Sequence, residues 1–130
     1  MKIRLYNRDE IFIIDLDTVL YFKAEDHYTI VYYGKETKQL LPFGLSQLES
    51  LIATKPGYKD DFIRAGRSHL LHYPRIIHAS VSKETVTLLN GESNIATVHV
   101  SRSVVKEIAN RLKNDGQTQP TEEGVSKLPI

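Results

Sequence analysis

The amino-acid sequence predicts a mainly β protein of several antiparallel strands, with one short central helix and one C-terminal helix. Short segments rich in β-branched and aromatic residues recur along most of the chain, and turn-forming residues separate them. Helical spacing of apolar residues appears in two segments, 46–54 and 104–112. The chain has 130 residues, of which 41% are hydrophobic, so it can bury the core of one modest domain.

The first strands are expected in the N-terminal third of the chain. Residues 1–15 are expected to form a hairpin that leads into the main domain, because polar and apolar residues alternate before the turn-forming Asn7 and Asp9 and an apolar run follows. Polar residues 25–27 are expected at the tip between the next two strands. Three strands are expected here: 19–24, 28–33 and 36–41.

The central part of the chain is expected to hold one helix and then further strands. Leucine and isoleucine at helical spacing predict a helix over 46–54, which the sequence Pro56-Gly57 ends. Asn90-Gly91 predicts a hairpin with a two-residue type I′ turn. The strands expected after the helix are 62–65, 68–71, 76–82, 84–89 and 95–100.

The C-terminal part is expected to be a helix followed by a tail. Ser101 or Ser103 can cap a helix whose apolar stripe runs over residues 104–112. Residues 114–130 have few apolar side chains to bury, so we expect them to form a flexible polar tail.

The composition excludes several classes of site. The chain contains no cysteine, which rules out disulfides, zinc–thiolate sites, iron–sulfur clusters and a thiol nucleophile. It contains no apolar run long enough to span a membrane, and Met1 leads directly into a polar alternation without the apolar segment of a secretory signal. We therefore expect a cytoplasmic protein that binds no membrane.

The net charge of +1 averages over segments that differ. Residues 64–113 hold eight Lys or Arg against three Asp or Glu, a balance of +5. Residues 1–63 hold eight Lys or Arg against ten Asp or Glu, and residues 114–130 hold one Lys against three Asp or Glu. The charge balance of each of these two segments is −2. A local excess of positive charge is expected where the partner is a polyanion such as nucleic acid, although an ordinary solvated face gives the same pattern.

Three blocks of the sequence, at family-like spacing, resemble the LytTR DNA-binding domain of bacterial transcription regulators. Residues 18–25 (TVLYFKAE), followed by a loop and Tyr28-Thr29, are similar to the opening strand, loop and strand of that family. Residues 62–71 (FIRAGRSHLL) are similar to its central segment. Residues 100–103 (VSRS), which run into the last predicted helix, are similar to its closing motif. Together the blocks indicate a LytTR-like domain over residues 16–113.

The resemblance implies an elongated β fold in which connecting loops, rather than a recognition helix, enter successive major grooves of double-stranded DNA. It also implies binding to pairs of short direct repeats, with possible homodimers on DNA, and bending of the duplex, which costs on the order of 1–6 kcal/mol. Because about fifteen residues precede the match, we expect a regulator without a receiver domain of its own, controlled by a separate sensor or regulator protein.

Three positions depart from the family pattern. Gly66 stands where the family often has histidine, His69 where it favours an aromatic residue, and His72 where asparagine is common. The change at Gly66 removes one side chain that could contact DNA.

The candidate DNA contacts come from the three blocks. Arg102 is the first choice for reading a base, because a guanidinium can donate two hydrogen bonds to guanine O6 and N7. Arg67 is expected to read a base or hold a phosphate, and Ser101 to contact a phosphate. The structural alternative for Arg102 is an internal ion pair or a cap to the last helix, and for Arg67 it is a cross-strand pair with a carboxylate. The other candidates are Asp26, His27, Tyr28 and Thr29 in the first loop, and Arg64 and His69 in the second block.

Two other functions were weighed against DNA binding. A protein-interaction adaptor that keeps the LytTR-like fold is the alternative that the acidic first half favours. An enzyme or a metal protein is not expected, and no cofactor is implied. Ser68 and His69 are adjacent and lack a third catalytic partner, while His69 and His72 would point to opposite faces of one regular strand.

Overall fold

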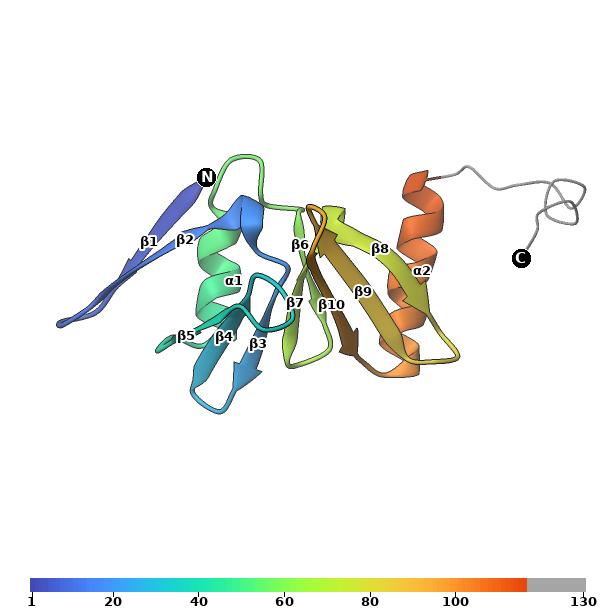
Figure 1. Ribbon diagram of the computed structural model, residues 1–130, viewed down its shortest axis with the longest axis horizontal. Coiled ribbons are helices and arrows are strands. Elements are labelled where there is room, and N and C mark those ends of the chain that lie inside the picture. The colour runs from blue at the N-terminus through green and yellow to red at the C-terminus, as the bar shows by residue number, and fades with distance from the viewer. Residues whose placement is uncertain (117–130) are drawn as a thin grey trace, which may run out of the picture.

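The computed structural model describes residues 1–116, which form two hydrophobic cores side by side along the longest axis of the molecule (Figure 1). The observed fold is mainly β and antiparallel, with two α-helices, as the sequence predicts. Most of the expected tail, residues 117–130, lies outside the described residues. Residues 114–116 belong instead to the last helix, which continues to Gly116.

A five-stranded antiparallel sheet forms the centre of the molecule, with strand order β5-β4-β3-β7-β6. Alternating buried side chains explain the strand character; in β4, for example, Thr29 and Val31 are buried while Tyr28 is exposed. The strands are β3 (Tyr21–Glu25), β4 (Tyr28–Tyr32), β5 (Lys38–Leu41), β6 (Phe62–Ala65) and β7 (His69–His72).

The N-terminal hairpin and the first α-helix complete one core. Strands β1 (Lys2–Tyr6) and β2 (Ile11–Asp15) form the antiparallel hairpin that the sequence predicts, and the 3₁₀ helix η1 (Leu16–Thr18) follows it. Helix α1 (Leu45–Ala53) buries Leu45, Leu48 and Ile52 against the sheet and the hairpin. Because the apolar residues of α1 recur every three or four positions, they fall on one face and can all reach this core.

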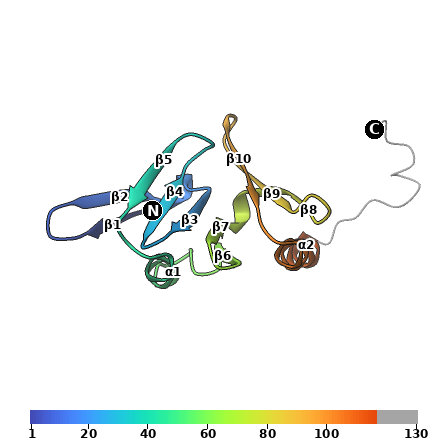
Figure 2. The ribbon, with the colours of Figure 1, turned by 90° about the horizontal axis from the view of Figure 1, so that it is seen from below.

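The second core is formed by a three-stranded sheet, the C-terminal helix and residues of β3, β6 and β7 in the five-stranded sheet. The sheet has the order β10-β9-β8. Helix α2 buries Val105 and Ile108 in this core. Figure 2 shows α1 and α2 on the same side of the molecule, behind their respective sheets. The elements of this half are η2 (Tyr73–Arg75), β8 (Ile76–Ser80), β9 (Thr85–Asn90), β10 (Asn94–His99) and α2 (Arg102–Gly116).

The predicted type I′ turn at Asn90-Gly91 is wrong. Asn90 pairs with Asn94, so the connection has three residues, Gly91 to Ser93, and Gly91 has a φ of +76°. Asn90 stays in the strand because its side-chain Nδ2 donates a hydrogen bond to the backbone carbonyl of Asp17, 3.1 Å away. A long-range contact, which local sequence cannot reveal, therefore overrides the local turn signal.

Candidate nucleic-acid interface

Three connections from distant parts of the sequence lie on one edge of the molecule. They are the β3–β4 turn, the β6–β7 turn and the β10–α2 junction, and all lie on the lower side in Figure 1. Figure 2 looks onto this edge and shows them following one another along the long axis. We call this surface the loop edge and define it as residues 25–28, 66–68 and 100–103.

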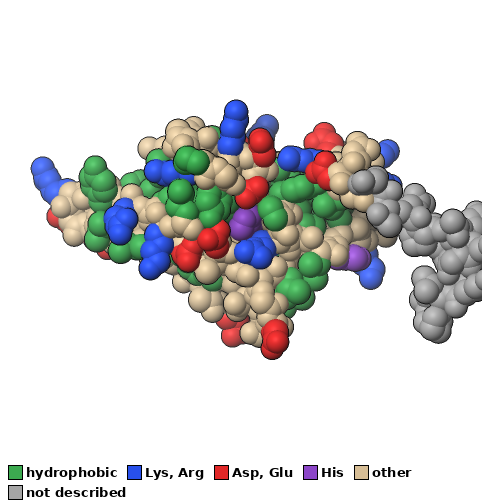
Figure 3. All heavy atoms as spheres, turned by 90° about the horizontal axis from the view of Figure 1, so that it is seen from above, with side chains coloured by type: hydrophobic (Ala, Val, Ile, Leu, Met, Phe, Trp, Pro, Cys, Tyr) green, Lys and Arg blue, Asp and Glu red, His purple; other side chains and the backbone are tan. Residues whose placement is uncertain are grey.

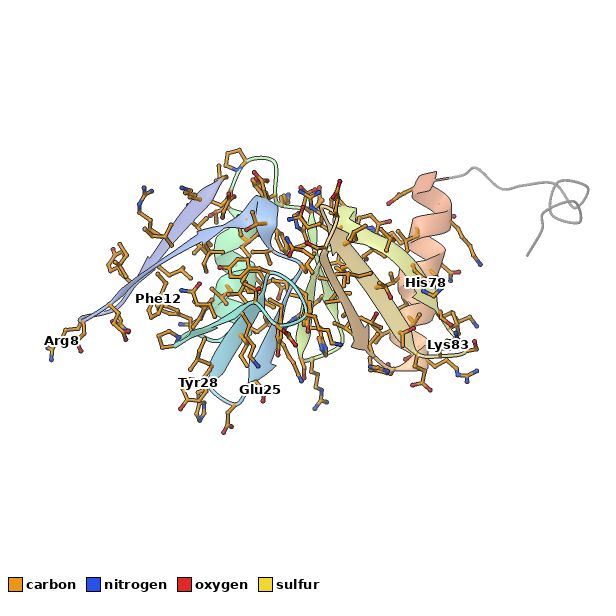
Figure 4. All side chains as sticks on the ribbon, in the orientation of Figure 1. Arg8, Phe12, Glu25, Tyr28, His78 and Lys83 are labelled. Atoms are coloured by element: carbon orange, nitrogen blue, oxygen red, sulfur yellow. The ribbon has the colours of Figure 1, made fainter. Side chains whose placement is uncertain are left out.

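The β3–β4 turn presents exposed polar and aromatic side chains at the loop edge. Glu25 pairs with Tyr28 in the ladder, so Asp26 and His27 form a two-residue turn, and Asp26 has a φ of +58°. The aromatic ring of Tyr28 is about half exposed, at 49%. Figure 4 shows Glu25 and Tyr28 at this end of the hairpin. The side chains of Asp26 and His27 make no hydrogen bond or ion pair within residues 1–116, so both are available to a ligand.

Thr29, which the sequence made a candidate DNA contact, does not belong to this exposed set. Its side chain is completely buried, with 0% exposure, and its hydroxyl donates a hydrogen bond to the carbonyl of Phe43 over 2.8 Å. Alternation along β4 turns Thr29 to the inner face while Tyr28 faces outward. Thr29 therefore holds the start of β4 to the segment that precedes α1.

The β6–β7 turn carries Arg67 at its exposed tip. Gly66 has a φ of +72°, a conformation that side-chain-bearing residues adopt at a cost, which gives the departure from the family pattern a structural reason. The Arg67 side chain makes no hydrogen bond or ion pair within the described part of the chain. The carbonyl of Ser68 accepts a hydrogen bond from the Ala24 amide at 2.7 Å, which ties this turn to β3.

Arg64 and His69 flank this turn but are not exposed in the same way. The Arg64 guanidinium is occupied by three contacts: Glu49, Ser46 and the carbonyl of Arg67. His69 is half-buried, with its ring centroid 6.0 Å from that of Tyr21. Burial, and then the charge of Lys23, lowers the pKa of His69 below its ordinary value, so the imidazole is neutral near pH 7.

The β10–α2 junction presents Arg102 at the first position of a 15-residue helix. The carbonyl of Ser101 accepts the first helical hydrogen bond, from the amide of Val105 at 3.0 Å, and the Ser101 and Ser103 hydroxyls lie 3.3 Å apart. The Arg102 side chain is exposed and makes no hydrogen bond or ion pair in the described residues. Neither the ion pair nor the side-chain cap that would be the structural alternative for Arg102 is formed here.

A shallow hollow of about 340 Å³ separates the last two parts of the loop edge. One wall is formed by residues 65–69 and the other by His99 to Ser101 and Val104. The two walls come close together at Gly66 and Val104, where a Cβ added to Gly66 would lie 3.9 Å from Val104 Cγ2. The loop edge is thus a row of turns with a hollow between the β6–β7 turn, which carries Arg67, and the β10–α2 junction, next to Arg102 in sequence.

Comparison of the sequence with protein-family models identifies the family of this chain. The family model described as the LytTr DNA-binding domain matches residues 9–113. The chain belongs to the LytTR family of DNA-binding domains. The match begins within the N-terminal hairpin and reaches into α2, so it covers all three parts of the loop edge.

Individual relatives agree with this membership. The chain is 28% identical over 102 residues to a regulator of Paraburkholderia xenovorans (strain LB400), named heme-containing CO-sensing transcriptional regulator RcoM 2. The match covers 78% of this chain and 36% of the regulator, so the chain spans about a third of that relative's length. A solved structure from Bacillus cereus, described as the LytTr DNA-binding domain of a response regulator, shares the fold with a TM-score of 0.56. Its sequence is 22% identical, and the match covers 85% of this chain and 95% of that one.

Next to the loop edge, the LytTR domain carries two residues that sequence reasoning missed. His99 lines the hollow beside Arg67, and it could have been found from its position immediately before the closing motif. Lys83 lies in the β8–β9 turn, on the same side of the molecule as Glu25 and Tyr28 (Figure 4). Nothing in the local sequence marked Lys83, because its place beside the loop edge depends on how the second sheet packs against the first.

Charge is distributed differently on the opposite side of this LytTR domain. Figure 3 shows that side, where basic and acidic side chains are interspersed among hydrophobic ones. On the loop edge, Arg67 and Arg102 have no acidic partner among residues 1–116, and the acids are confined to the β3–β4 turn, where Glu25 pairs with Lys23 at 3.4 Å. The unpaired cations at the loop edge can attract a polyanion.

The described part of this LytTR domain offers neither a metal site nor a membrane-spanning helix. Residues 1–116 contain no group of three or more histidines, cysteines or carboxylates that could hold a metal ion. None of the helices in the same range is both long and apolar enough to cross a membrane.

Proposed function

We propose that this LytTR domain regulates transcription by reading double-stranded DNA with the loop edge, whose turns enter successive major grooves. One observation carries the proposal. Segments more than 30 residues apart in sequence converge on one edge and present Arg67 and Arg102, both exposed and both without an internal partner in the described residues. A guanidinium left free on the surface can donate two parallel hydrogen bonds to guanine O6 and N7.

Each part of the loop edge has a role in this proposal. Arg102 reads a base, and Arg67 reads a base or holds a phosphate on the other side of the hollow. Asp26 and His27 lie at the tip of the hairpin formed by β3 and β4. The Asp26 carboxylate can accept a hydrogen bond from cytosine N4, and the His27 imidazole can donate one to DNA. Tyr28 contacts the sugar–phosphate backbone beside them, and the Ser101 hydroxyl contacts a phosphate at the start of α2, where the helix dipole favours an anion.

The elongated shape favours a site that spans more than one groove. Turns that follow one another along the long axis of the domain can reach neighbouring grooves, and we propose that the duplex bends toward them, as the family resemblance implies. Such a bend costs on the order of 1–6 kcal/mol, which phosphate contacts at both ends offset. We therefore propose pairs of short direct repeats as the preferred site.

Selection from a random duplex library near 150 mM salt tests the proposal, since nonspecific phosphate contacts weaken there. Wild type should enrich a short repeated motif, and Arg102→Ala should lose the enrichment. Arg8→Ala is the matched control, because Arg8 is an exposed arginine at the tip of the N-terminal hairpin, away from the loop edge (Figure 4). Enrichment that survives Arg102→Ala but not Arg8→Ala would refute this interface.

Protein contact is a second candidate function, and one observation favours it. The outer face of the β1–β2 hairpin exposes Tyr6 at 73%, Ile11 at 60% and Ile13 at 51%, an apolar surface that suits a partner. The partner could be a second copy on DNA or a separate sensor or regulator protein. If the folded chain retains no duplex near 150 mM salt, this function takes the lead, and Ile13→Ser should then abolish binding of the partner.

A further inference from the structure

Arg64 uses all three guanidinium nitrogens on groups of its own protein. Its Nε lies 3.3 Å from a Glu49 carboxylate oxygen, and its Nη2 donates to the Ser46 hydroxyl over 3.0 Å. Its Nη1 donates to the backbone carbonyl of Arg67 over 3.3 Å. One side chain on β6 therefore connects helix α1 to the β6–β7 turn.

The α1 end of this connection is rigid. Ser46 and Glu49 are three positions apart on the helix, so both face the same side and can hold one guanidinium. The opposite side of α1 is fixed in the first core through Leu45, Leu48 and Ile52, each 5% exposed or less. Because a planar guanidinium with several bonds has few other orientations, Arg64 takes its position from α1.

The other end of the connection is the β6–β7 turn, the part of the loop edge whose backbone most requires restraint. Residues 66–68 are exposed, and Gly66 is a glycine, the residue type with the widest range of backbone conformations. Two successive carbonyls of this turn are held from opposite sides: that of Arg67 by Arg64, and that of Ser68 by the Ala24 amide of β3 at 2.7 Å. Of these two peptides, the one between Arg67 and Ser68 adjoins Cα of Arg67, so the hydrogen bond from Arg64 restricts the direction in which the Arg67 side chain leaves the backbone.

We infer that Arg64 is a positioning residue and does not itself contact DNA. Held by Ser46 and Glu49, it sets the conformation of the β6–β7 turn, so that Arg67 meets the duplex in one orientation. This inference rests on the proposed function and replaces the direct DNA contact that the sequence suggested for Arg64. It makes Glu49, on a helix that forms no part of the loop edge, a determinant of DNA specificity.

The two roles of Arg64 predict opposite effects of Glu49→Gln. If Arg64 contacted DNA directly, loss of the competing carboxylate would free its charge, and affinity for every duplex would rise. If Arg64 positions the turn, the same substitution lets the Arg67 side chain take more orientations. Discrimination between the preferred duplex and other duplexes then falls. Glu107→Gln is the matched control, because it removes the same charge from an exposed position on α2.

The experiment measures Kd of the full chain for a selected duplex and for its scrambled version. We expect Glu49→Gln to lower the ratio of the two affinities about three- to tenfold, the size expected for the loss of one ordinary hydrogen bond at a partly exposed position. Glu107→Gln should leave the ratio unchanged. In the Arg67→Ala background, Glu49→Gln should have no further effect, because the side chain it helps to place is gone. An unchanged ratio, or an increase in affinity for both duplexes beyond that of Glu107→Gln, would overturn the inference.

A second measurement needs no DNA and separates this inference from the proposed function. Backbone amide order parameters of residues 66–68 should fall in Glu49→Gln and stay at the wild-type level in Glu107→Gln. If the wild type does not discriminate between duplexes, the proposed function fails, and the order parameters still decide whether Arg64 fixes the turn. Unchanged order parameters in Glu49→Gln would overturn the positioning role.

Discussion

The Nη2 atom of Arg75 donates a hydrogen bond to the backbone carbonyl of Asp17 over 3.0 Å, across 58 residues of sequence. The same carbonyl accepts from Nδ2 of Asn90 at 3.1 Å. Asp17 lies in η1, beside the first core, whereas Arg75 and Asn90 lie in η2 and β9 of the second half. One backbone carbonyl therefore joins the two halves of the molecule on the side away from the loop edge.

Removal of this junction should destabilise the whole domain. We expect Arg75→Ala to lower the free energy of unfolding by about 1–3 kcal/mol, because a partly buried side chain is deleted and the backbone carbonyl of Asp17 loses one of its two donors. Urea denaturation followed by circular dichroism measures the change. Arg8→Ala, at an exposed tip, should change stability by less than about 0.5 kcal/mol. Equal effects of the two variants would show that the junction contributes nothing.

Arg102→Ala should weaken binding to the preferred duplex by about 1–3 kcal/mol and relax its specificity, because one bidentate base contact is lost. Arg102→Lys should recover little of this, since an ammonium cannot donate two parallel hydrogen bonds to one guanine. Fluorescence anisotropy with the preferred and the scrambled duplex measures both effects. An equal loss on the two duplexes would make Arg102 a phosphate contact instead.

The sequence was sufficient to predict most of the fold, because most elements are specified locally. Strands with alternating burial, such as β4, and the helix with buried Leu45, Leu48 and Ile52 carry their own periodicity. The expected strands all appear with ends shifted by two residues or fewer. The prediction of a type I′ turn at Asn90 was wrong because the geometry of the turn depends on Asp17, 73 residues away.

The candidate site was predicted less completely, because side-chain availability is a tertiary property. Arg64 and Arg67 lie in one short block and look equivalent in sequence, yet Arg64 is occupied by Ser46 and Glu49 while Arg67 makes no side-chain contact in residues 1–116. Only the packing of α1 against β6 distinguishes them. The burial of Thr29, in contrast, could have been predicted from the sequence. Side chains alternate between the two faces of β4, so Thr29 faces inward if its neighbour Tyr28 faces solvent.

Thr29→Val should reduce stability and leave DNA binding unchanged. Valine fills the same buried space but cannot donate to the Phe43 carbonyl, so the free energy of unfolding should fall by about 1–2 kcal/mol. Thermal denaturation measures the loss, and anisotropy at a temperature where the variant is folded measures binding. Tyr28→Ala should show the opposite behaviour, since Tyr28 is exposed at the loop edge. A specific loss of DNA discrimination in folded Thr29→Val would restore the role that its burial contradicts.

The stability of the domain should depend on pH through His72. The imidazole is buried, stacks on Phe62 with ring centroids 4.3 Å apart, and places Nδ1 2.7 Å from the carbonyl of Val19. Burial lowers the pKa of His72 below its ordinary value of 6.5, although the bond to Val19 opposes the shift. The folded state thus binds fewer protons than the unfolded state once the pH approaches 6.5. Stability is therefore complete above that pH and falls as the pH drops below it.

Unfolding free energies measured by urea titration between about pH 5 and 7.5 test this expectation, since a lowered histidine pKa makes the free energy of unfolding rise with pH in that window. His72→Phe should flatten the rise, because the group that takes up the proton on unfolding is gone. His27→Gln is the control, because His27 is exposed at the loop edge, and this variant should keep the wild-type slope. The lowered pKa of His69 adds to the slope in the same direction, so some dependence should remain in His72→Phe. A His72→Phe profile as steep as that of the wild type would assign the pH dependence to other groups.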